Sequence, residues 1–219
     1  MPGFSVSRPT QVKPGVKSMP AVPFDSPSTS GLIQTHFASV RRVLTEVEIS
    51  AVQRVADIFR AARDRGSFIY IAGNGGSSAT ASHWVNDLGK ATKRSGCPPL
   101  KVLCLSDNTA WFSALSNDEG YDRSFAGQLE NFATPGDVLT CLSASGNSAN
   151  LVRAVELARE RSLTTVALLG FDGGALKGLV DQVVWVRTEK GTYELVEDVH
   201  SVICHAITRR LVTDRPGRA

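Results

Sequence analysis

The sequence lacks a strong excess of either charge. It has 24 lysines and arginines against 21 aspartates and glutamates, and a formal net charge of +3. A protein that binds nucleic acid typically gathers basic side chains into a patch or stripe, and no such stripe is present. We therefore expect no nucleic-acid partner.

Cysteines and long apolar runs are also scarce. None of the four cysteines belongs to a CxxC pair. Cys104 and Cys141 fall within strand-like apolar runs, so we expect buried, reduced thiols. No run approaches the roughly 20 apolar residues that span a membrane, and the first residues show no apolar core of a secretory signal. We therefore expect a cytoplasmic protein with no membrane partner.

Proline is concentrated at one end of the chain. Residues 1–30 contain six of the ten prolines, with serine, glycine and lysine between them and no apolar period. This composition predicts a flexible arm. Residues 31–213 are expected to form one domain, and residues 214–219 a frayed tail.

Within that domain, helical and strand-like patterns alternate. Apolar residues at helical spacing over 31–65 predict two helices, or one long helix broken near residues 49–50. Strand-like runs then alternate with helical stretches, and several runs are almost continuously apolar, as in parallel sheets covered on both faces. We predict a three-layer α/β/α sandwich with about five parallel strands and added N-terminal helices. The expected strands are residues 68–72, 102–105, 137–142, 164–169 and 182–186, and the expected later helices are 77–90, 124–132, 148–160 and 194–212.

Two loops that follow expected strands and open helices suggest anion binding. Residues 73–78 read Gly-Asn-Gly-Gly-Ser-Ser, which matches neither a Walker A loop nor a dinucleotide fingerprint. Alone, that loop is compatible with a merely tight turn. Residues 143–148 read Ser-Ala-Ser-Gly-Asn-Ser, and three hydroxyls at one helix N-terminus exceed what a helix cap needs. The pair predicts a phosphate cradle beyond the strand ends.

A third loop, residues 117–121, reads Asn-Asp-Glu-Gly-Tyr. It is compatible with a capped turn and with polar contacts to sugar hydroxyls.

Over about residues 32–213 the chain resembles the phosphoheptose isomerase branch of the SIS (sugar isomerase) family. The resemblance rests on four features that occur in the family's order: GNGGS, a helix carrying a histidine, SNDEGYD and LSASGNSAN. The resemblance implies a flavodoxin-like SIS fold. It also implies an aldose–ketose isomerase that converts sedoheptulose 7-phosphate to D-glycero-D-manno-heptose 7-phosphate, or acts on a related higher-carbon sugar phosphate, by a metal-assisted enediol mechanism. It further implies a homotetramer with active sites between subunits.

Roles carried across by the resemblance fall on matching positions. Threonine is common in the family where this chain has Ala144, so one hydroxyl is missing but the backbone amide remains. The implied substrate-binding residues are Asn74, Gly75, Gly76, Ser77, Asp87, Asn117, Asp118, Ser143, Ala144, Ser145, Ser148 and Glu197.

The resemblance also implies a metal site of His83, Asp87, Glu197 and His205. Asp87 stands in place of a glutamate and Glu197 in place of a glutamine. His83 and Asp87 share one helix face, whereas Glu197 and His205 lie about 12 Å apart along one helix, so joint ligation requires long reach, a bent helix or different subunits. The set suits Zn²⁺, one per subunit, and other divalent ions. The expected catalytic residues are Asp87, Glu197 and His205, with either carboxylate as the base.

Other interpretations stay open. A non-catalytic SIS module, such as the branch that regulates bacterial replication initiation, needs no cluster of this kind. Another SIS isomerase acting on pentose or amino-hexose phosphates is a further alternative. We expect His200 to support the site or the core, and Lys90 to be a solvated helix end or a substrate contact.

Overall fold

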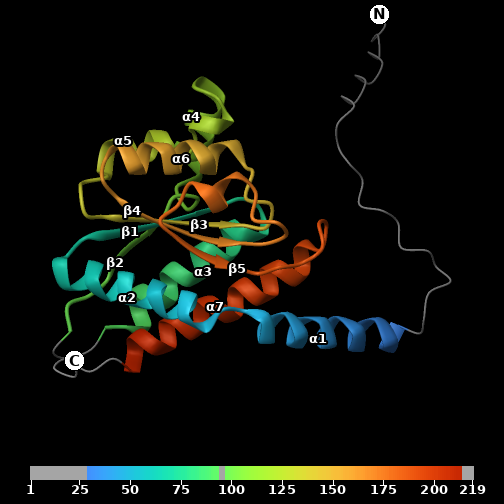
Figure 1. Cartoon of the computed structure of the whole chain (residues 1–219). Helices are drawn as coiled ribbons and strands as arrows, with labels where there is room; N and C mark the ends of the chain where they lie inside the picture. The colour runs from blue at the N-terminus through green and yellow to red at the C-terminus, as the bar shows by residue number, and fades with distance from the viewer. Residues whose placement is uncertain (1–28, 94–96, 214–219) are drawn as a thin grey trace, which may run out of the picture.

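A computed structural model of the chain describes residues 29–93 and 97–213, so the arm (except residues 29–30) and the tail lie outside the described residues. Five strands form one parallel sheet in the order β2-β1-β3-β4-β5 (Figure 1). This confirms the predicted sheet. The strands are β1 Phe68–Gly73, β2 Lys101–Cys104, β3 Val138–Ser143, β4 Thr164–Leu169 and β5 Gln182–Trp185.

Helices cover both faces of this sheet, which confirms the three-layer arrangement. On one face pack α2 (Ile49–Arg65), α3 (Gly76–Ala91) and α7 (Tyr193–Thr213). On the other lie α4 (Thr109–Asp118), α5 (Ala126–Phe132) and α6 (Ala149–Glu160). Both cores are apolar, and the fully buried strand β3 explains the continuous apolar runs in the sequence.

The packing of α3 against α7 rests on a buried tryptophan. Trp84 of α3 lies 5.3 Å, ring centroid to ring centroid, from Phe59 of α2. Its indole Nε1 donates to Thr208 Oγ1 of α7 at 3.1 Å. The contact satisfies the polar edge of a large buried side chain and holds the two helices that carry the candidate metal ligands.

The N-terminal stretch forms two helices, which was one of the two predicted alternatives, the other being one long broken helix. Helix α1 (Thr29–Glu46) ends shortly before Ile49 begins α2. It packs along α7 and projects beyond the sandwich (Figure 1). The large apolar side chains of Leu32, Ile33 and Phe37 are exposed on it.

Some short elements were not predicted. Helix α4 begins after Asn108, whose Oδ1 accepts a hydrogen bond from the Trp111 amide at 3.1 Å. Leu115 is its one buried residue, which explains why its apolar period is weak. Two 3₁₀ helices, Tyr121–Arg123 (η1) and Ala175–Gly178 (η2), also connect longer elements, and α5 starts at Ala126 rather than 124.

The positions of the cysteines agree with the prediction. Cys104 and Cys141 are buried, and neither is in a disulfide. None of the described helices combines the length and apolar content needed to cross a bilayer.

The strand order places a topological switch point between β1 and β3. From β1 the chain crosses to β2 on one side, whereas β3 pairs with β1 on the other and leads on to β4. The loops after β1 and β3 therefore diverge and leave a crevice beyond their carboxyl ends, where ligands bind in such sheets.

Candidate active site

A small pocket of about 130 Å³ lies in this crevice. It brings together the loop after β1, the loop after β3 and one turn of α7, which are distant in the sequence. Seven of the residues predicted to bind substrate are therefore adjacent. The pocket is lined by Asn74, Ser77, Leu142, Ser143, Ala144, Ser145, Ser148, Leu151, Tyr193 and Glu197.

The loop after β3 is held in a cradle shape by its own hydrogen bonds. Ser143 Oγ accepts from the Gly146 amide at 3.0 Å, and the Asn147 side chain donates to the Ser145 carbonyl at 2.9 Å. Gly146 has φ +64°, and a Cβ there would collide with the Gly173 carbonyl. Glycine is therefore required at this position.

Ser148 is the N-cap residue of α6, but its side chain makes no capping hydrogen bond. Its hydroxyl therefore remains available to a ligand at the positive end of the helix dipole. This arrangement fits a phosphate group.

A carboxylate from α7 lies close to the loop after β1, at the start of α3. Gly75 has φ +54°, and α3 begins at Gly76. A Cβ on Gly76 would collide with both carboxylate oxygens of Glu197. The absence of a side chain at position 76 thus leaves the space that the Glu197 carboxylate occupies.

The electrostatic surroundings of Glu197 favour its protonated form. Burial has the largest effect, and the negative charges of Asp198 and Glu194 add to it, so the pKa of Glu197 is raised. A carboxyl whose pKa is raised toward the working pH is suited to moving protons.

A buried amide network, which the sequence interpretation missed, anchors the loop after β1. The side-chain amides of Asn74 and Asn150 bond each other in both directions, at 2.9 and 3.0 Å. Tyr121 Oη also donates to Asn74 Oδ1 at 2.8 Å, and Asn150 Nδ2 donates to Ser124 Oγ at 3.1 Å. Asn150 is fully buried, so it fixes the orientation of Asn74 without being exposed itself.

The predicted sugar contacts Asn117 and Asp118 do not reach the pocket within one chain. They end α4, where Asn117 Nδ2 donates to Asp118 Oδ1 at 2.7 Å, and both are exposed. From the same segment it is Tyr121 that reaches the pocket loop, through Asn74. Contact of Asn117 and Asp118 with substrate stays a prediction.

Three of the four predicted metal ligands converge at the surface of α3 and α7. His83 Nε2 lies 3.0 Å from His205 Nε2, and Asp87 Oδ2 lies 3.4 Å from each of these nitrogens. Among the described residues these three form a group of potential ligands.

The two separations of 3.4 Å fit a shared cation, whereas the 3.0 Å between the histidine nitrogens is slightly shorter than in a bound pair. Atoms bound to one tetrahedral zinc ion at about 2.0–2.2 Å lie roughly 3.3–3.6 Å from one another. Two imidazole nitrogens that face each other at 3.0 Å also need a proton or a cation between them. Side chains from two helices thus form a group that is compatible with a bound metal ion.

Glu197 is not in this group. Its carboxylate lies in the pocket beside Gly76, two turns of α7 before His205. Its role as a metal ligand therefore stays a prediction, and within one chain its position suits contact with substrate.

His200 lies between Glu197 and His205 on α7. Its ring is 1% exposed, and neither nitrogen makes a hydrogen bond of ordinary geometry, although the Leu169 carbonyl is nearby. Burial lowers the pKa of His200 to about 4, so the ring is neutral. It belongs neither to the three-ligand group nor to the pocket lining. Lys90 is exposed at the end of α3.

Comparison with known proteins shows similarity to SIS domains and to phosphoheptose isomerases. A model of the SIS domain matches residues 35–170. The phosphoheptose isomerase of Chlorobaculum tepidum is 38% identical over 170 residues, which cover 77% of this chain and 79% of that protein. The probable phosphoheptose isomerase of Thermoplasma acidophilum is 34% identical over 76% of this chain and 90% of that protein.

Solved structures also resemble this chain. The phosphoheptose isomerase of Neisseria gonorrhoeae superposes with a TM-score of 0.74 at 29% identity, covering 83% of this chain and 98% of that one. That of Francisella tularensis gives a TM-score of 0.77 over 86% of this chain and 100% of that one. At 23% identity, the latter supports the fold alone.

Proposed function

Since the chain belongs to the phosphoheptose isomerase branch of the SIS domain family, we propose that it converts sedoheptulose 7-phosphate into D-glycero-D-manno-heptose 7-phosphate. A closely related higher-carbon sugar phosphate is the alternative substrate. The reaction is an aldose–ketose isomerisation, in which a hydrogen moves between C1 and C2.

One observation carries the proposal. One pocket at the β1–β3 switch point is lined by the loop after β3, the loop after β1 and Glu197. A phosphate cradle and a carboxyl of raised pKa in one pocket are what isomerisation of a phosphorylated sugar requires.

In this proposal the hydroxyls of Ser145 and Ser148 and the backbone amides at the N-terminus of α6 hold the phosphate. The Glu197 carboxylate takes a proton from C1 of the ketose, while the C2 carbonyl oxygen gains a proton, to give an enediol. The same carboxyl then returns its proton to C2 as the hydroxyl at C1 loses its own, which forms the aldehyde. Asp87 was the other candidate base, but it faces His83 and His205 rather than the pocket lining.

We further propose that His83, Asp87 and His205 hold one Zn²⁺ per subunit, with Glu197 as the fourth ligand across subunits. A bound zinc ion would polarise the sugar carbonyl and stabilise the developing enediolate charge. The spacing of the three side chains supports this assignment. If His205 does not bind the zinc ion, it serves as the second acid or base beside the catalytic carboxyl.

A homotetramer with active sites between subunits is the assembly that we propose. The exposed Leu32, Ile33 and Phe37 of α1 support it, because isolated chains rarely expose several large apolar residues on one projecting helix. A groove of about 460 Å³ between α1 and α7, lined partly by Phe37 and Val202, provides a surface that another copy can cover.

We also propose a cytoplasmic location, with which the four free cysteines are compatible.

The test is an assay of metal-stripped and zinc-reloaded protein with sedoheptulose 7-phosphate, followed by NMR. We expect heptose 7-phosphate to appear with the reloaded protein and much more slowly with the stripped one. Equal rates would contradict the metal assignment. Binding of the sugar phosphate without turnover would contradict the enzyme and favour the non-catalytic module.

A further inference from the structure

Tyr193 is the exposed member of the lining of the candidate active site. It is 52% exposed, whereas the other residues of that lining are buried or half-buried. It begins α7 and lies four residues before Glu197, on the same face of the helix. The rise of a helix separates two such residues by about 6 Å along its axis. Tyr193 therefore stands at the rim of the pocket, one turn away from the carboxylate.

The pocket is too small to enclose a sugar phosphate of seven carbons. Its volume is about 130 Å³, whereas pockets that enclose a small organic ligand have roughly 300–1,000 Å³. In the proposed reaction the phosphate lies at Ser145 and Ser148, and C1 and C2 lie at Glu197. The carbons from C3 to C7 then have to extend past the open rim, where Tyr193 stands.

The ring of Tyr193 rests on an aromatic neighbour. Its centroid lies 5.0 Å from that of Phe171, and the two ring planes are 79° apart, which is an edge-to-face contact. Phe171 is buried in a cluster with Ala144 and Val196. Ala144 belongs to the loop after β3, and Val196 directly precedes Glu197. The support of Tyr193 is therefore packed against two of the segments that form the pocket.

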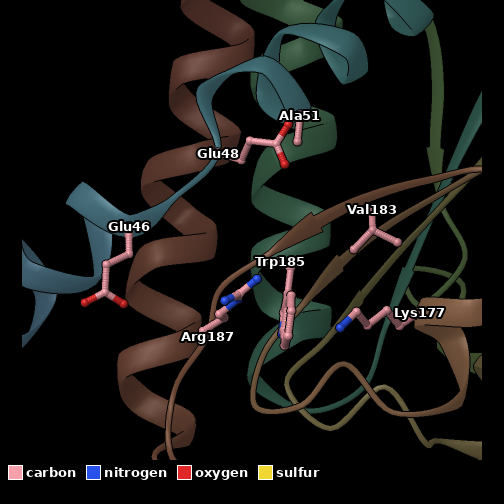
Figure 2. Close-up of a pocket in the computed structure, with 7 residues that line it drawn as sticks. All are labelled: Glu46, Glu48, Ala51, Lys177, Val183, Trp185 and Arg187. Carbon is pink, nitrogen blue, oxygen red and sulfur yellow. The ribbon is translucent and has the colours of Figure 1, made fainter.

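The backbone of Phe171 has an uncommon conformation. Its φ is +43°, a left-handed value that a residue with a side chain keeps where its surroundings impose it. One such restraint is Trp185, whose Nε1 donates to the Phe171 carbonyl at 3.0 Å. The Trp185 ring is itself held between Lys177 and Arg187 (Figure 2), whose Nζ and Cζ lie 3.1 and 4.2 Å from its centroid. The support of the Tyr193 ring is thus in place before a ligand binds, which lowers the entropy cost of binding.

The free surface of Tyr193 suits a carbohydrate. Among the described residues its hydroxyl has no hydrogen-bond partner, whereas those of Tyr70 and Tyr121 each have one. A phenol hydroxyl can both donate and accept, and a tyrosine presents an apolar ring next to this polar tip. A sugar chain likewise carries C–H groups next to hydroxyls, so both parts of the side chain can contact it at once.

We propose that Tyr193 binds the carbon chain of the substrate between its reacting carbons and its phosphate, and so selects sugar phosphates long enough to reach the rim. The ring packs against C–H groups of that chain, and the hydroxyl forms a hydrogen bond with one of its hydroxyls. The nature of the ligand rests on the proposed function, but the role of Tyr193 concerns binding and does not depend on turnover.

The test measures, by calorimetry, the affinity of the full chain for sedoheptulose 7-phosphate and for inorganic phosphate. Tyr193→Ala should weaken binding of the sugar phosphate by roughly 10- to 50-fold, and Tyr193→Phe by roughly 2- to 10-fold. Inorganic phosphate has no carbon chain to reach the rim, so its affinity should stay unchanged in both variants.

Phe132→Ala is the matched control. It removes a ring that is 47% exposed and makes an edge-to-face contact with Trp111 at 5.4 Å, but that lies outside the pocket lining. Both affinities of this variant should equal those of the wild type.

Three results would overturn the proposal. They are wild-type affinity of Tyr193→Ala for the sugar phosphate, an equal loss of affinity for inorganic phosphate, and an equal loss in Phe132→Ala. Tyr193→Phe keeps the ring on Phe171, so wild-type affinity in this variant would refute the hydrogen bond.

The same measurements separate this proposal from the proposed function. Binding of the sugar phosphate without turnover in the wild type contradicts the isomerase, yet a selective loss of affinity in Tyr193→Ala still supports the role of Tyr193. A wild type that does not bind the sugar phosphate refutes both proposals.

Discussion

The pocket and the His83–Asp87–His205 group are both built on α3 and α7, yet by different means. The pocket is formed at strand ends, where glycines, backbone amides and buried amide side chains fix the geometry. The group stands on helix surfaces, where both histidine side chains are 55% exposed and depend on how α3 packs against α7. The difference indicates that the pocket is fixed before any ligand arrives, whereas the group would be completed by the proposed ion.

The largest expected effect lies on the pocket side. Glu197→Gln keeps the shape of the side chain but cannot take up a proton, so turnover should fall by roughly 10²- to 10⁴-fold with sugar-phosphate binding retained. Because the pKa of Glu197 is raised, wild-type activity should decrease as the pH falls through that pKa, and the variant should lose this dependence. The measurement is turnover against pH.

Glu189→Gln, an exposed glutamate close to the start of α7, is the matched control and should behave as the wild type. Full turnover of Glu197→Gln would remove this carboxylate from the chemistry and return the role of base to Asp87.

The second largest effect is expected for the His83–Asp87–His205 group. Asp87→Asn removes the negative ligand between two histidines, so zinc affinity and turnover should both fall by about 10²-fold or more, while sugar-phosphate binding survives. Zinc affinity is measured by competition with a chelator, with Asn86→Ala on the same helix as the control. Unchanged affinity and turnover in Asp87→Asn would exclude Asp87 from both the metal site and the mechanism.

His200, which lies between the two regions, gives a test of stability. An unfolded histidine binds a proton near pH 6.5, whereas the buried ring does so only near pH 4. Protonation therefore favours the unfolded chain. The stability is fully present above about pH 6.5 and falls toward about pH 4, by roughly 3 kcal/mol in total.

This pH dependence is measured by urea unfolding of the wild type and of His200→Leu across that range. The variant should lose the part of the slope that His200 causes. If the free energy of unfolding of the variant depends on pH as strongly as that of the wild type, a group other than His200 causes the dependence.

The smallest effect concerns the amide network. Asn150→Ala leaves Asn74 without its reciprocal partner, at a cost of about 1–3 kcal/mol shared between stability and substrate affinity. We expect a lower Tm and a raised KM, with kcat less affected and zinc affinity unchanged. A KM equal to that of the wild type would show that Asn74 does not need to be held in place.

The repeating parts of the fold were predictable because they follow from short-range patterns. Strand β4 was expected at residues 164–169 and is found there, since its continuous apolar run leaves little choice. The loop at residues 143–148 was also predictable as a connection between a strand and a helix, because its serines and glycine lie close together in the sequence, and its binding of phosphate stays a proposal. Helix α4 was not, because it is short and mostly exposed and its apolar spacing carries little information.

The parts of the site that depend on long-range packing were not predictable from pattern. Asn150 lies within a helix, 76 residues from Asn74, and no local signal distinguishes it from a buried helix residue. Resemblance to a family suggested Glu197 as a metal ligand, but only the packing of α7 against the start of α3 shows that its carboxylate lies in the pocket.

The close approach of Glu197 to Gly76 makes these two positions epistatic. Alanine at position 76 should be harmful while residue 197 is glutamate, because the added methyl group occupies the place of the carboxylate. With a shorter residue at position 197 the same alanine should be nearly neutral. Replacement of Gly76 is therefore conditional on residue 197, so an alanine at position 76 can be tolerated only after residue 197 has become shorter.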